Sequence, residues 1–65
     1  MGMNKIKVDI FPGRVRLDGM NVPLAELEST VKELYQGFQF DLCFVCGFAS
    51  KSDVTTAKKI LGLPL

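Results

Sequence analysis

The chain has 65 residues, 48% of them hydrophobic, and a formal net charge of +1 from 8 basic and 7 acidic residues. This length predicts one small domain spanning residues 1–65. A dedicated nucleic-acid binder usually has a clear basic excess, so nucleic acid is not expected as a partner. Histidine is absent, which removes the commonest general base and metal ligand. We therefore expect no enzyme activity, no catalytic residues, no metal and no cofactor.

No run of about 18 apolar residues occurs, so no membrane insertion is expected. The opening residues 1–5 lack the apolar core of a signal peptide, which indicates a cytoplasmic protein. The apolar fraction is high for a domain with so little interior. It indicates a homo-oligomer with a buried interface, and a dimer is the first expectation.

The first half of the chain predicts a hairpin and a helix. Residues 5–10 and 14–17 alternate between apolar and polar side chains, and Pro12-Gly13 between them is typical of a turn. Asp18-Gly19 predicts a second turn. Apolar residues at helical spacing predict a helix over 23–36, in which Glu28 and Lys32 form a favourable pair.

The second half predicts one strand and one helix. Residues 38–46 are aromatic and apolar, and strict alternation would separate them into two faces. The first face would hold Phe38, Phe40, Leu42, Phe44 and Cys46, and the second Gln39, Asp41, Cys43 and Val45. Ser50 with Asp53 predicts a helix start, and Gly62 its end. The apolar tail, residues 63–65, is expected to dock on another surface.

The resulting fold class is α+β. The order β-β-α-β-α predicts a two-layer sandwich, with an antiparallel hairpin plus a third strand and both helices on one sheet face. That face would carry Ile6, Val8, Ile10, Val15 and Leu17.

Cys43 and Cys46 have the C-x-x-C spacing of redox and metal sites. Here the pair lies inside a predicted strand, where residues three apart point to opposite faces. Zinc would need two more ligands. The pattern therefore favours packing cysteines over redox or metal chemistry, with Cys43 able to pair across a dimer.

The segment from Gly47 to Asp53 is the best candidate for a ligand site. A helix N-terminus presents free N–H groups to anions, and Gly47, Ser50, Lys51 and Ser52 would surround a small anionic ligand such as a nucleotide. The glycine-lysine-hydroxyl end of a true phosphate loop is missing, and Asp53 would repel an anion. An ordinary helix cap with an exposed lysine is the favoured alternative.

Four basic residues of the predicted hairpin, Lys5, Lys7, Arg14 and Arg16, lie on one sheet face. Sheets bind single-stranded nucleic acid when aromatic side chains share such a face, and no aromatic residue is expected there. A solvated face is favoured, followed by a protein or dimer contact and then by nucleic acid.

Residues 14–34 resemble the soluble domain of the biopolymer-transport ExbD/TolR family. The matching positions are Leu17, Asp18, Gly19, Val22, Leu24, Glu26 and Leu27. The resemblance implies that family's fold, a dimerising, partner-binding role and, for a longer native chain, a periplasmic location. The family's N-terminal membrane helix and its membrane aspartate have no counterpart in this sequence.

The function expected from the sequence is a non-catalytic binding module that self-associates and binds a partner protein. Its interface would include Cys43, Val45, Leu63 and Leu65. One alternative is a protein that binds or sequesters a small anionic ligand, for example a small phage inhibitor. The other is an ExbD/TolR-like envelope transport module that lacks its membrane helix.

Overall fold

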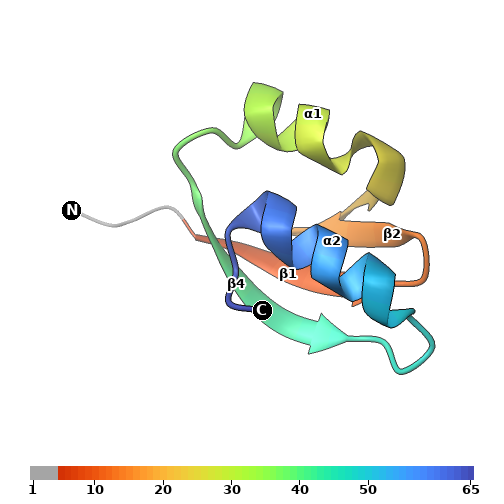
Figure 1. The fold of residues 1–65 in the computed structure, drawn as a ribbon. Coiled ribbons are helices and arrows are strands. Elements are labelled where there is room, and N and C mark those ends of the chain that lie inside the picture. Colours follow the sequence, from red (N-terminus) through yellow and green to blue (C-terminus); the bar gives the residue numbers. More distant parts are fainter. Residues whose placement is uncertain (1–4) are drawn as a thin grey trace.

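The computed structural model describes residues 5–65, so the expectation that the opening residues 1–5 hold no signal peptide falls, except for Lys5, outside the described residues. The elements are β1 (Lys5–Phe11), β2 (Arg14–Leu17), β3 (Met20–Pro23), α1 (Leu24–Leu34), β4 (Gln39–Val45) and α2 (Lys51–Leu61). The four strands form one mixed sheet, and both helices cover the same face of it (Figure 1). The predicted α+β fold class is therefore confirmed.

The strands lie in the order β3-β2-β1-β4. β1 pairs antiparallel with β2, and β2 pairs antiparallel with β3, so the first three strands form a meander. β4 then pairs parallel with β1 on its other side, after α1 has carried the chain back across the sheet. β3 and β4 are consequently the two edges of the sheet.

The third strand adds to the predicted elements. Asp18 (φ 51°) and Gly19 (φ 90°) form a tight turn with positive φ at both residues, which suits a two-residue hairpin. The chain therefore continues directly into β3, whose last residue is Pro23. The expectation that Pro23 opens the first helix is wrong by one residue, and α1 also ends earlier than predicted, with Tyr35 as its C-cap.

The core lies between the sheet and the helices. Three residues of the helices, Leu27, Ala57 and Leu61, pack against six strand residues: Ile6, Val8, Ile10, Val15, Leu17 and Val22. All nine are buried, and no polar or charged side chain is buried among the described residues. The predicted alternation of β1 and β2 places their apolar residues on this face.

β4 departs from the predicted alternation at Cys43. Leu42 pairs with Val8, but Asp9 pairs with Phe44, so Cys43 is an extra residue that shifts the register. A β-bulge of this kind reverses the side-chain alternation beyond it. The prediction that Phe44 shares a face with Phe40 and Leu42 is therefore wrong.

Both ends of α2 are as predicted. The Asp53 N–H donates to the Ser50 hydroxyl at 3.1 Å, which caps the start of the helix. At the other end Gly62 adopts the left-handed conformation (φ 71°), and the Leu63 N–H donates to the Lys58 carbonyl at 2.8 Å. The C-terminal tail therefore turns back from α2.

Candidate functional site

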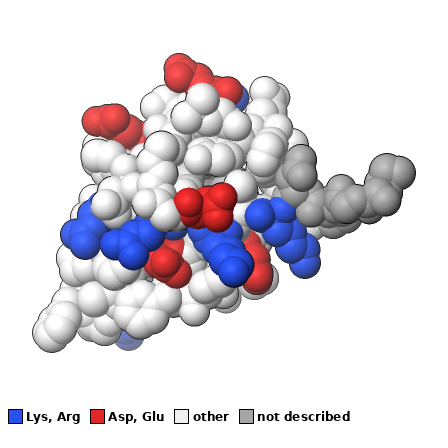
Figure 2. Space-filling view, turned by 180° about the vertical axis from the view of Figure 1, so that it is seen from behind, with Lys and Arg blue, Asp and Glu red and all other residues white. Residues whose placement is uncertain are grey.

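The face of the sheet opposite the helices is not covered by any described element. We call it the open face; it consists of Lys5, Lys7, Asp9, Phe11, Arg14, Arg16, Asn21, Pro23, Gln39, Asp41 and Phe44. Its four cations and two carboxylates leave a local excess of positive charge. Figure 2 shows basic side chains in a band across the molecule, with acidic side chains among them. The predicted gathering of Lys5, Lys7, Arg14 and Arg16 on one face agrees with the strand pairing.

Two aromatic rings lie on the open face beside two of these cations. The ring centroids of Phe11 and Phe44 are 5.7 Å apart, and the rings are tilted by 46°. The Cζ atoms of Arg14 and Arg16 lie 4.8 and 5.0 Å from the Phe11 centroid, within range of cation–π attraction. Phe44 is 51% exposed, so much of its surface remains available to a ligand.

The sequence patterns had not indicated the aromatic pair, although one of its two residues was predictable. Phe11 continues the alternation of Lys5, Lys7 and Asp9, so its position could have been found from β1 alone. Phe44 lies on the open face only because of the bulge at Cys43, and no residue pattern in β4 predicts that bulge.

A second surface lies along the outer edge of β4. Among the described residues this strand pairs only with β1, so its other edge has no strand neighbour. Cys43 is exposed there, Val45 is 39% exposed, and Phe48 in the following turn is 90% exposed. Val45 pairs with Ile10 and therefore lies on the helix side of the sheet, not with Gln39 and Asp41 as predicted.

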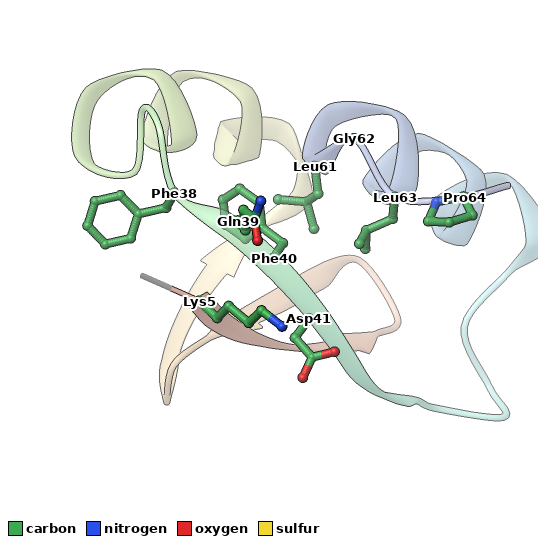
Figure 3. A pocket seen from close by; sticks show the side chains of 9 residues that line it. All are labelled: Lys5, Phe38, Gln39, Phe40, Asp41, Leu61, Gly62, Leu63 and Pro64. Atoms are coloured by element: carbon green, nitrogen blue, oxygen red, sulfur yellow. The ribbon is translucent and has the colours of Figure 1, made fainter. Parts of the chain in front are cut away.

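The C-terminal tail lies beside the first half of β4. A pocket of about 390 Å³ separates the two and is lined by Lys5, Phe38, Gln39, Phe40, Asp41, Leu61, Gly62, Leu63 and Pro64 (Figure 3). Leu63 is half-buried and packs against the core, whereas Leu65 is 76% exposed. The predicted interface residues thus lie in two places, with Cys43 and Val45 in the second half of β4 and the tail near its start.

The segment from Gly47 to Ser52 forms the turn and cap that lead into α2. The Ser50 hydroxyl accepts from Asp53 and lies 3.2 Å from the Ser52 hydroxyl, so both hydroxyls take part in local hydrogen bonds. Lys51 is exposed in the first turn of α2. The arrangement is that of a helix cap, and binding of an anion by Gly47, Ser50, Lys51 and Ser52 stays a prediction.

Both cysteines are free thiols, Cys43 exposed and Cys46 half-buried just beyond the end of β4. Within residues 5–65, no three histidine, cysteine or acidic side chains gather as metal ligands would. The helices of this described part of the chain are too short or too polar to cross a bilayer.

The described residues of these surfaces present a strand edge without a neighbour, exposed apolar side chains and a group of cations. Comparison with known proteins adds no relative: no protein-family model matches the chain, and neither the curated proteins nor the solved structures give a match.

Proposed function

We propose that the chain is a non-catalytic binding module that self-associates and binds a partner protein, and that it self-associates along the outer edge of β4. The observation that carries this proposal is the free edge of β4 next to the exposed side chains of Val45 and Phe48. An exposed edge strand beside apolar side chains is a template for pairing with another chain.

The two edges of the sheet differ in a way that favours β4. β3 has four residues and ends in Pro23, which has no N–H to donate to a neighbouring strand. β4 has seven residues and no proline. A second copy would therefore find more backbone donors and acceptors along β4 than along β3.

The size of the core supports self-association. Only nine of the described residues form the buried apolar cluster, although 48% of the chain is hydrophobic. Domains of this size commonly gain stability from disulfides, metals or oligomerisation. Burial of Phe48 and Val45 against a second copy would add apolar contact that the single copy lacks.

Cys43 provides a chemical probe of this arrangement. In an antiparallel pair of β4 strands centred near Cys43, the two Cys43 residues would lie opposite each other, at a Cα separation compatible with a disulfide. Mild oxidation is then expected to trap a covalent dimer in the wild type and in Cys46→Ser, but not in Cys43→Ser.

The mass of the assembly tests the proposal directly. Native mass spectrometry of the wild type is expected to show a dimer, and Phe48→Ser and Val45→Asp are expected to shift it to the monomer. Leu34→Ser is the matched control, because Leu34 is also an exposed apolar side chain (59%) but lies on α1.

A wild type that stays monomeric at high concentration would contradict self-association. A dimer that both β4 variants leave intact would contradict the β4 edge as its location. Extra mass of a few hundred daltons per chain that Lys51→Ala removes would instead favour the small-ligand alternative at Gly47, Ser50, Lys51 and Ser52.

The partner-binding part of the proposal has independent support only from the sequence. The resemblance of residues 14–34 to the ExbD/TolR family implies a dimerising, partner-binding role of the same kind. Capture experiments with the Phe48→Ser and Leu34→Ser variants side by side would show whether a partner uses the β4 edge as well.

A further inference from the structure

We propose that the open face binds single-stranded nucleic acid, with Phe44 stacking on a base and the cations of β1 and β2 contacting the phosphates. The proposal concerns a different surface from the β4 edge, and it stands or falls separately from self-association. Its basis is the placement of Phe11, Phe44, Arg14 and Arg16 together on an uncovered sheet.

The aromatic pair provides the stacking surface. Sheets that bind unpaired bases do so through aromatic rings on neighbouring strands, because every base has a flat face that can stack. Phe11 and Phe44 lie on adjacent strands with centroids 5.7 Å apart. Since the rings are tilted by 46°, they cannot form one flat platform, and the half-exposed Phe44 is the ring that a base can reach.

The cations provide the phosphate contacts. Arg14 and Arg16 are held beside the Phe11 ring, and the Nε of Arg16 donates to the Asn21 side chain at 3.4 Å. Lys5 and Lys7 extend the positive charge along β1. A strand that stacks on Phe44 would therefore have cations beside it along β1 and β2.

The acidic residues of the same face limit the affinity. Asp9 pairs with Arg16 across β1 and β2, and Asp41 pairs with Lys7 across β1 and β4. Each carboxylate offsets part of the neighbouring positive charge. Binding is therefore expected to be weak, with a Kd of roughly 10⁻⁴ to 10⁻⁶ M, and to weaken as salt rises.

A duplex and an acidic protein differ from this ligand in testable ways. In a duplex the bases are stacked on each other, so no base face is free to stack on the Phe44 ring. An acidic polypeptide matches the cations but has no bases to stack. Loss of affinity on removal of the aromatic ring therefore separates single-stranded nucleic acid from both.

The experiment is fluorescence anisotropy with a labelled oligothymidylate of about 12 nucleotides, titrated between about 50 and 200 mM salt. Phe44→Leu keeps an apolar side chain but removes the ring, and it is expected to weaken binding about tenfold. Phe44→Tyr keeps the ring and is expected to bind like the wild type. Leu34→Ala, which truncates an exposed apolar side chain on α1 away from both the open face and the β4 edge, is the control and is expected to change nothing.

A second matched pair tests the charges. Lys7→Gln on the open face is expected to weaken binding and to lower the slope of affinity against salt by about 1, whereas Lys59→Gln on α2 is not. No binding by the wild type at low salt, or equal binding by wild type and Phe44→Leu, would overturn the proposal. Equally tight binding of an oligoglutamate peptide would also overturn it, by showing that the face recognises acidic polypeptides.

Discussion

The backbone N–H of Gly13 donates a hydrogen bond to the Asp53 carboxylate at 3.2 Å, across 40 positions of the chain. The carbonyl of Gly13 accepts from the Leu24 N–H at 3.0 Å. A single residue in the β1–β2 turn thus contacts the N-terminal ends of both helices. The two hydrogen bonds connect the first turn of each helix to the central hairpin.

Removing the Asp53 carboxylate is expected to loosen this connection. Asp53→Ala should lower the free energy of unfolding by about 1 kcal/mol, because the Gly13 N–H loses a charged acceptor and α2 loses an acidic group near its N-terminus. Asp53→Asn keeps an acceptor oxygen and should lose less. Urea unfolding measures both, and equal stability of Asp53→Ala and the wild type would show that the hydrogen bond contributes nothing.

The role of Gly62 at the C-terminal end of α2 can be tested against Gly47, which lies in the turn before α2. Gly62 has a φ of 71°, whereas Gly47 has no positive φ, and an added Cβ would meet nothing within 4 Å at either residue. Gly62→Ala is therefore expected to lower stability by about 1 kcal/mol through backbone strain alone. Gly47→Ala should be neutral or slightly stabilising. A thermal melt of the two variants compares them, and an equal effect would rule out strain at Gly62 as the cause.

Leu27 and Leu34 lie on the same helix in opposite environments. Leu27 is fully buried, and Leu27→Ala is expected to cost about 2–5 kcal/mol through lost contact and a residual cavity. For a chain of this size that is a large share of the total stability. Leu34→Ala, at an exposed position, should stay within about 0.5 kcal/mol of the wild type. Denaturant unfolding measures the free energy of unfolding of both variants. Equal stability of the two would contradict the prediction.

Deletion of Cys43 should be tolerated. Without it, Leu42, Phe44 and Val45 would alternate regularly while keeping their partners Val8, Asp9 and Ile10. Deletion of Asp41 is the control, because it forces Phe40 or Leu42 off the helix side and should cost about 1 kcal/mol or more. Circular dichroism and unfolding curves follow both variants. If deletion of Cys43 unfolds the protein while deletion of Asp41 does not, the register assigned to β4 is wrong.

The parts of the fold that local chemistry determines could be predicted from the sequence. Ser50 caps α2 and Gly62 ends it, and Glu28 and Lys32 form the expected pair at 3.5 Å, because each depends on residues within one helical turn. β3 was not predicted, because its four residues are too few to establish a pattern and are held in place by pairing with β2.

The candidate surfaces were predictable only in part, for the same reason. The basic residues of β1 and β2 follow a simple alternation, so their common face could be inferred. The position of Phe44 depends on how β4 fits against β1, which is a contact between distant parts of the chain. Val45 changes face for the same reason.

β1 is the first described strand in the chain, and it lies in the sheet between β2 and β4. It is therefore fully paired only when β4, which comes late in the chain, has joined the sheet. Its pairing with β2 needs only a short turn, whereas its pairing with β4 closes a loop of more than half the chain. Closing such a loop costs chain entropy before any contact repays it, so we expect this step to set the folding rate. The β1–β2–β3 meander would then form early, and variants in β4 would slow refolding more than equally destabilising variants in β3.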